Sequence, residues 1–239
     1  MRPMRTFVLL LFLPAVGGSA ASAQVGHPPA SSPYREILDG HSVTPVVGYF
    51  AGGGGRFGIG AHNGVIYGLR YGVRTGKTLE FAFSFAQGDL DRFIVDPFKG
   101  PANRVTGPLD QRTSFGDVTV QFNVTGGKAW HGLAPYSGLT LGVAVGRDLA
   151  ADTSGYDFGN KFYFAPQLGT RFFMGSRAHL RAEVRAPFWK LNYPERFGQE
   201  PVEDPGTTED PHAVITDNQF DEWTVSPWIQ VGLGYAFRF

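Results

Sequence analysis

The sequence predicts an all-β fold in which eight antiparallel strands close into an up-and-down transmembrane β-barrel. Two patterns support this prediction: eight segments alternate apolar with polar or small residues, and the connections between them alternate long with short. The composition agrees, since the 239-residue chain contains 33 Gly and 21 Phe but few apolar stripes of helical period. Alternation with a period of two is typical of a strand that has one apolar face.

The eight alternating segments are expected approximately over residues 43–50, 64–74, 78–88, 113–125, 133–147, 160–173, 178–190 and 223–239. The clearest runs from Leu79 to Phe85, where apolar side chains alternate with Glu80, Ala82 and Ser84. Eight strands make a small barrel, whose interior is filled by side chains.

The connections between these strands are about 13, 3, 24, 7, 12, 4 and 32 residues long. A transmembrane barrel with both termini in the periplasm has short turns at one end and long extracellular loops at the other. A soluble β-sandwich has no reason to alternate in this way. We therefore expect both termini to be periplasmic.

The N-terminal residues have the composition of a secretory signal peptide. Arg2 and Arg5 precede an apolar run, which ends in small residues at Ala21-Ser22-Ala23. We expect residues 1–23 to be a signal peptide, residues 24–41 a short periplasmic segment, and residues 42–239 the barrel.

The charge balance of the mature chain is close to neutral. Removal of Arg2 and Arg5 with the signal peptide lowers the number of Lys and Arg residues from 21 to 19, against 21 Asp and Glu residues. This balance argues against nucleic-acid binding, which favours a basic face.

The C-terminal strand adds a second indication of location. Gln230, Gly232, Tyr235 and Phe237, with Phe239 as a terminal aromatic, resemble the signal by which outer-membrane barrels are recognised for assembly. With the other features, the chain is similar to the small outer-membrane barrel family of the OmpA/OmpX type over nearly its whole mature length. The resemblance implies a monomer in the outer membrane of a Gram-negative bacterium. It also implies contact with membrane lipid, lipopolysaccharide, periplasmic chaperones and the barrel assembly machinery.

Strand parity places charged residues on the inner wall of the barrel. Arg181, Glu183 and Arg185 alternate with apolar residues, and an Arg facing lipid at the membrane midplane costs about 2–4 kcal/mol. The same parity gives further inward candidates: Arg70, Glu80, Asp117, Gln167, Arg171, Gln230 and Arg238. Because charges in a narrow lumen need partners, we predict an ion-pair network centred on Arg181, Glu183 and Arg185, with Glu80 and Asp117 as acidic partners.

This fold leaves the function open. One hypothesis is that the network plugs the interior and that the protein has a structural or surface-interaction role, with an extracellular partner bound by the loops near residues 51–63, 89–112, 148–159 and 191–222. The alternative is a narrow, low-conductance pore that is lined by Arg181, Glu183 and Arg185. A third hypothesis is an outer-leaflet lipid A hydrolase, for which His62 with Ser154 or Asp152 is a candidate site. No His-x-Ser pair of the kind that such enzymes use occurs, and we predict no enzymatic activity.

The long segment 191–222 is strongly acidic, with Arg196 as its one basic residue. Carboxylates can bind Ca²⁺ or Mg²⁺, but the spacing of a calcium-binding loop is absent, and we interpret the segment as a solvated loop. Aromatic residues near strand ends fit interfacial girdles, although Trp189 and Trp228 fall on the inward parity. The girdle candidates are Trp189, Tyr193, Trp223 and Trp228 at one end and Trp130, Phe172, Tyr235, Phe237 and Phe239 at the other.

Two glycine patterns resemble parts of nucleotide-binding loops. Gly53, Gly55 and Gly58 match G-x-G-x-x-G, but no helix follows them, and Gly76-Lys77-Thr78 lacks the first Gly of a P-loop. We interpret both as loop or turn glycines. The chain has no Cys, and its His and acidic residues show no ligand spacing, so no cofactor and no metal are predicted.

Overall fold

The computed structural model describes residues 32–37, 40–147, 152, 154–175 and 177–237. The chain divides into two units, Met1–Pro33 and Tyr34–Phe239, and every strand among the described residues belongs to the second unit. The predicted signal peptide, Arg238 and Phe239 lie outside the described residues. Within the described part of the chain, no helix is long and apolar enough to cross a membrane.

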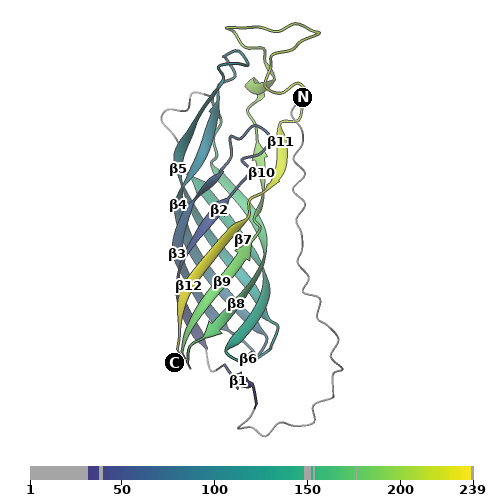
Figure 1. Cartoon of the computed structure of the whole chain (residues 1–239). Coiled ribbons are helices and arrows are strands. Elements are labelled where there is room, and N and C mark those ends of the chain that lie inside the picture. Colours follow the sequence, from purple (N-terminus) through teal and green to yellow (C-terminus); the bar gives the residue numbers. More distant parts are fainter. Residues whose placement is uncertain (1–31, 38–39, 148–151, 153, 176, 238–239) are drawn as a thin grey trace, which may run out of the picture. The chain divides into compact units, whose positions relative to one another are not determined.

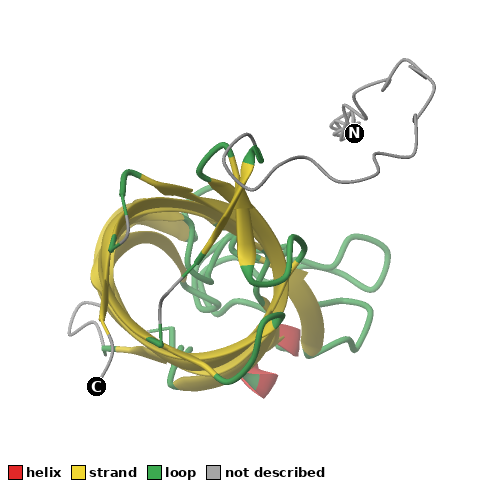
Figure 2. Ribbon diagram, turned by 90° about the horizontal axis from the view of Figure 1, so that it is seen from below, coloured by secondary structure: helices red, strands yellow, loops and turns green. Residues whose placement is uncertain are grey.

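Eight strands form a closed antiparallel barrel, as predicted (Figures 1 and 2). They are β2 (His41–Ala51), β3 (Asn63–Arg74), β4 (Leu79–Val95), β5 (Val105–Asn123), β7 (Leu133–Gly146), β8 (Asn160–Phe173), β9 (Ala178–Arg185) and β12 (Trp228–Phe237). Each strand pairs with the next along the chain, and β12 pairs with β2 to close the ring. Closure leaves these strands without an open edge.

Four short strands lie outside this ring. β1 (Tyr34–Glu36) pairs with β6 (Lys128–Trp130) beside the β5–β7 turn. β10 (Phe188–Asn192) and β11 (Asp221–Val225) form a hairpin that continues the wall beyond β9 and β12. The prediction of single strands over 178–190 and 223–239 is therefore wrong in detail. Pro187 and Pro227 lack the N–H that a continuous ladder requires, so each strand is interrupted there.

The two ends of the barrel differ in their connections. At the turn end, residues 75–78, 124–132 and 174–177 join the strands; at the loop end, the connections include 52–62, 96–104 and 147–159. Strands β4 and β5 are longer than predicted and pair as far as Val95 and Val105. The expected loop over 89–112 is therefore mostly hairpin. The η2 helix (Glu195–Gly198), a single 3₁₀ turn, lies in the connection between β10 and β11.

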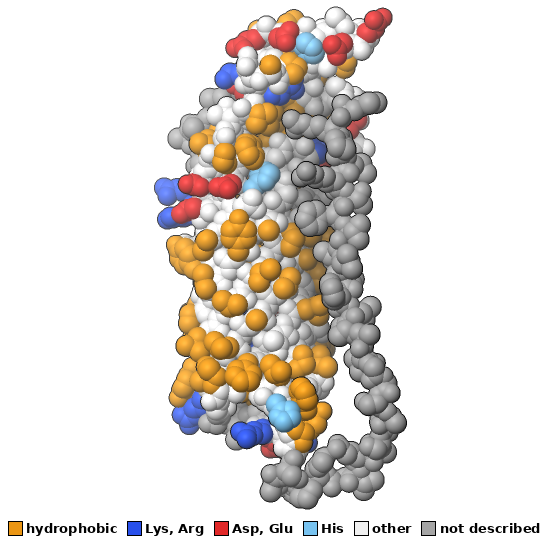
Figure 3. All heavy atoms as spheres, in the orientation of Figure 1, with side chains coloured by type: hydrophobic (Ala, Val, Ile, Leu, Met, Phe, Trp, Pro, Cys, Tyr) orange, Lys and Arg blue, Asp and Glu red, His pale blue; other side chains and the backbone are white. Residues whose placement is uncertain are grey.

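The outer wall carries an apolar belt, and the inner wall is largely polar. Leu139, Phe83 and Leu233 are 48%, 53% and 55% exposed, whereas Thr119, Gln121 and Thr140 are fully buried. On the face drawn in Figure 3, apolar side chains spread over the middle of the barrel, and charged side chains lie toward both ends. A barrel that is apolar outside and polar inside is a transmembrane barrel.

Candidate functional site: the barrel lumen

Glu183 on β9 is the centre of a buried hydrogen-bond network. Its Oε2 accepts from Arg181 Nη2 at 2.5 Å and from the hydroxyl of Tyr136 at 2.8 Å. Its Oε1 accepts from Gln230 Nε2 at 2.9 Å and also from Arg185 Nε. One carboxylate thus connects β7, β9 and β12 across the lumen.

Arg185 extends the network toward the loop end. Its Nη1 donates to Asp117 Oδ2 at 2.9 Å, and the hydroxyl of Tyr163 donates to the same oxygen, also at 2.9 Å. The Arg185 guanidinium also lies over the Trp228 ring, 5.4 Å from the ring centroid. Charge pairing and aromatic packing therefore meet at this level of the barrel.

Glu80 is the centre of the network toward the turn end. Its Oε2 accepts from Arg171 Nη1 at 2.9 Å, and its Oε1 lies 4.0 Å from Arg70 Nη2. Gln121 connects this group to the Glu183 group, because its Oε1 accepts from Arg181 Nη2 at 2.7 Å and from Arg70 Nη2 at 3.1 Å. Two guanidinium groups therefore share one neutral amide oxygen.

Of the eight charged residues that parity predicted for the lumen, Arg238 lies outside the described residues. The structure places the other seven on the inner wall, where none is more than 8% exposed: Arg70, Glu80, Asp117, Arg171, Arg181, Glu183 and Arg185. Asp117 lies beside the predicted centre, but Glu80 pairs with Arg171 and Arg70 instead of with Arg181 or Arg185. Strand parity also places Gln121 on the inner wall, although its linking role was missed. The roles of Tyr136 and Tyr163 have no counterpart in the sequence patterns.

Small inward residues make room for these long side chains. A methyl group on Gly142 would lie 2.5 Å from Cζ of Tyr163, and one on Gly169 would lie 2.3 Å from the Tyr136 hydroxyl. Both tyrosines can therefore reach across to their carboxylate partners because the facing positions have no side chain.

An aromatic layer crosses the lumen on the loop side of the charged network. It consists of six side chains, each at most 1% exposed: Phe50, Phe115, Phe158, Tyr163, Trp189 and Trp228. Phe50 stacks on Trp189 with ring centroids 5.7 Å apart, and Phe115 meets Trp228 edge-on at 5.1 Å. Since β2, β5, β8, β10 and β12 all contribute rings, the layer extends across the full width of the barrel.

This layer corrects the interfacial assignment of Trp189 and Trp228. Both were grouped with the outer girdle, yet both lie inside the barrel, as their strand parity indicated. Tyr193 is also buried, whereas Trp223 is 62% exposed and Trp130 is 47% exposed, as girdle residues would be. The alternation of the backbone, and not the residue type, decides which aromatics face lipid.

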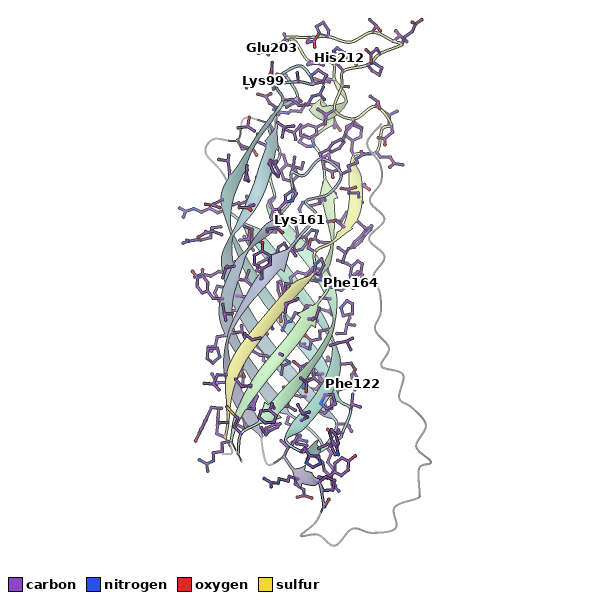
Figure 4. The ribbon with its side chains drawn as sticks, in the orientation of Figure 1. Lys99, Phe122, Lys161, Phe164, Glu203 and His212 are labelled. Carbon is purple, nitrogen blue, oxygen red and sulfur yellow. The ribbon has the colours of Figure 1, made fainter. Side chains whose placement is uncertain are left out.

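The acidic segment between β10 and β11 is partly packed. Phe197 and Ile215 are buried beside Leu191 and Tyr193 in a cluster beneath the loops, which differs from the expected solvated loop. The tip of the segment contacts the β4–β5 hairpin, where the Glu203 N–H donates to the Phe98 carbonyl and Arg104 donates to the His212 carbonyl. Figure 4 shows Lys99, Glu203 and His212 together at the far end of the molecule. We call residues 96–104 and 193–220 the distal lobe.

Arg56 joins the β2–β3 loop to the distal lobe. Its Nη1 donates to Asp217 Oδ2 at 2.6 Å, and its Nη2 donates to the Gln219 carbonyl. The hydrogen bond from Arg56 holds the pKa of the Asp217 carboxyl below its ordinary value. The Arg56 backbone N–H donates to Glu222, whose carboxylate also accepts from Tyr193.

The hydrolase candidates are not brought together as a catalytic pair. His62 contacts the Gly58 carbonyl through Nε2 and packs against Phe93, whereas the Ser154 hydroxyl donates to Asp152. Asp152 also pairs with the buried Arg92. Among the described residues, no group of three His, Asp or Glu side chains could hold a metal ion. The two glycine patterns lie in the β2–β3 loop and the β3–β4 turn.

No protein-family model matches the chain, and no curated protein matches it. Among solved structures, the outer membrane protein OprG from Pseudomonas aeruginosa is 14% identical, with a TM-score of 0.48, and the match covers 87% of this chain and 100% of OprG. Neisserial surface protein A is 12% identical, with a TM-score of 0.49, and the match covers 86% of this chain and 98% of that protein. Ail, the attachment invasion locus protein of Yersinia pestis, is 14% identical, with a TM-score of 0.41, and the match covers 84% of this chain and 100% of Ail. The strand pairing by itself establishes the barrel architecture.

Proposed function

We propose that this chain is an outer-membrane barrel of a Gram-negative bacterium that acts as a closed scaffold and presents the distal lobe at the cell surface. The observation that carries the proposal is the aromatic layer, whose six side chains are at most 1% exposed. Tightly packed rings leave no path for a hydrated solute. A closed lumen leaves the loop end as the part that can act, and we propose that its role is structural or a surface interaction, without catalysis.

Uptake by proteoliposomes tests closure. Vesicles that carry the refolded protein should take up small sugars no faster than empty vesicles. Faster uptake would favour the alternative, a narrow pore lined by Arg181, Glu183 and Arg185.

The absence of native Cys makes the proposed location and orientation directly measurable. We expect Lys99→Cys in the distal lobe to react with a membrane-impermeant maleimide on intact cells. Lys77→Cys, in the β3–β4 turn, should react only after the outer membrane is opened. The opposite pattern would contradict an extracellular distal lobe and periplasmic termini.

The surface role has its own test. Cells that carry the full protein are compared, for adhesion to host-cell layers, with cells in which a Gly-Ser linker replaces residues 199–214. Lower adhesion at an equal surface level of protein supports a partner for the distal lobe. Equal adhesion contradicts a partner for the distal lobe and has no bearing on whether the lumen is closed.

Export and assembly belong to the same proposal. We propose that residues 1–23 direct export, that periplasmic chaperones and the barrel assembly machinery then act on the C-terminal strand, and that the folded monomer contacts phospholipid and lipopolysaccharide. Tyr235 is 52% exposed on the outer wall, where a receptor could contact it. Joint substitution of Phe237 and Phe239 by Ala should reduce the folded, heat-modifiable band in membranes, and an unchanged band would contradict the assembly role.

A further inference from the structure

Arg70 on β3 is a buried cation whose one side-chain hydrogen bond to the described residues is to a neutral group. Its side chain is 2% exposed. Nη2 donates to Gln121 Oε1 at 3.1 Å, and Glu80 Oε1 is 4.0 Å from Nη2, beyond hydrogen-bond distance. Nε and Nη1 are buried and donate to no acceptor within the described chain.

A second unmatched donor lies beside Arg70. In the strand register, Arg70 lies between Thr44 on β2 and Ser84 on β4. The hydroxyl of Ser84 is also buried without a hydrogen-bond partner among the described residues. Arg70 and Ser84 are therefore register neighbours on adjacent strands, and each has a buried donor without a hydrogen-bond partner among the described residues.

Glu80, which pairs with Arg70 at 4.0 Å, is shared with Arg171 and makes no hydrogen bond to Arg70. Arg181 donates to the same Gln121 oxygen at 2.7 Å, so two cations converge on one neutral acceptor. Among the described residues, Glu80 and Asp117 each have one buried oxygen without a hydrogen-bond partner, but their other oxygens already accept from Arg171 and Arg185. A buried cation that shares its counter-ion and lacks a hydrogen bond to it is only partly compensated.

Water alone would satisfy these donors without supplying the missing negative charge. A small anion accepts hydrogen bonds from the donors of Arg70 and Ser84. Its negative charge also compensates the two neighbouring guanidinium groups of Arg70 and Arg181. The narrow, side-chain-filled lumen of an eight-stranded barrel favours a monatomic ion over a larger oxyanion.

We propose that Arg70 Nε and Nη1, with the Ser84 hydroxyl, bind a halide-sized monovalent anion inside the barrel. The ion is enclosed when the strands close around it, and it stabilises the charged network. This site is independent of whether the barrel conducts and of what the distal lobe binds.

Bromide is the probe that locates the ion. Protein refolded and crystallised in sodium bromide should give an anomalous scattering peak in contact with the Arg70 guanidinium and Ser84. Crystals of Arg70→Gln grown in the same way should lack it. Absence of the peak in the wild-type protein, with ordered water in its place, would overturn the proposal.

Thermal unfolding supplies a second, independent readout. The wild-type protein should unfold at a higher temperature in sodium bromide than in sodium gluconate of equal ionic strength. Arg112→Gln, which removes an exposed outer-wall guanidinium, should keep this difference, and Arg70→Gln should lose it. If Arg70→Gln does not refold, Arg70→Ala combined with Ser84→Ala takes its place. An equal bromide response in the wild-type protein and the lumen variant would contradict the site.

Discussion

Tyr163 on β8 donates its hydroxyl hydrogen to Asp117 on β5 across the lumen, over 2.9 Å. The same tyrosine ring packs against Trp189, with centroids 6.3 Å apart, as part of the aromatic layer. One side chain therefore belongs both to the layer and to the charged network, and it fixes the height at which the lumen changes from polar to apolar.

Removal of the Tyr163 hydroxyl tests this connection. Tyr163→Phe keeps the ring but deprives Asp117 of one donor, and a hydrogen bond to a charged group contributes about 1.5–3 kcal/mol. We expect the free energy of unfolding in lipid vesicles to fall by about that amount, as measured by urea titration. Tyr49→Phe, on the exposed outer wall, is the matched control and should change little.

Glu183 should be the most sensitive position of the network. Glu183→Gln leaves Arg181 and Arg185 beside a neutral side chain, and removal of one partner from a buried ion pair costs about 3–5 kcal/mol. Urea unfolding should show this loss, whereas the exposed Glu203→Gln should leave the midpoint unchanged. Equal midpoints for the two variants would mean that the network contributes nothing to stability.

Sequence alternation predicted the barrel and its inner wall because strand parity is strict wherever one face meets lipid. Glu80 and Arg181 follow directly from their apolar neighbours. Beyond the apolar belt, toward the loop end, the outward residues no longer have to be apolar. Asp89 and Asp91 interrupt the outer apolar pattern of β4 there, so the predicted end of this strand is too early. Phe197 and Ile215 were missed because they pack inside a segment whose acids and prolines resemble a solvated loop. The partners of Glu80 depend on side-chain reach across the lumen, which no local pattern encodes.

The apolar belt predicts a cost for charge on its outer face. Leu139 lies near the middle of the outward face of β7 and is 48% exposed. Leu139→Arg should lower the free energy of unfolding in a bilayer by about 2–4 kcal/mol, because the guanidinium meets hydrocarbon. Val202→Arg in the distal lobe, at a position 80% exposed, should have no such effect. An unchanged free energy of unfolding for Leu139→Arg would mean that this face does not contact the membrane.

Arg56 should hold the distal lobe against the β2–β3 loop. Arg56→Ala removes its contacts with Asp217 and Gln219, so limited proteolysis within residues 199–220 should become faster at neutral pH. Lys190→Ala, which breaks the exposed pair with Asp221, is the control and should leave the cleavage rate close to that of the wild type.

The same contact should depend on pH in one direction. Because Arg56 lowers the pKa of Asp217, its stabilising contribution is fully present above the ordinary carboxyl pKa and is lost as the pH falls through the lowered value. The titration midpoint of the Asp217 carboxyl, followed by carbon NMR, should therefore be higher in Arg56→Ala than in the wild type. Equal midpoints would contradict the assigned contact.

Closure of the lumen by the aromatic layer is the central claim, and single-channel recording in a planar bilayer tests it most directly. The wild-type protein should be silent, as should Phe83→Ala, which removes a ring from the lipid-facing wall. Phe115→Ala combined with Trp189→Ala removes two rings from the layer and should produce openings. Stable openings of the wild-type protein, changed by Arg181→Ala or Glu183→Ala, would contradict the closed scaffold and identify the charged network as the lining of a pore.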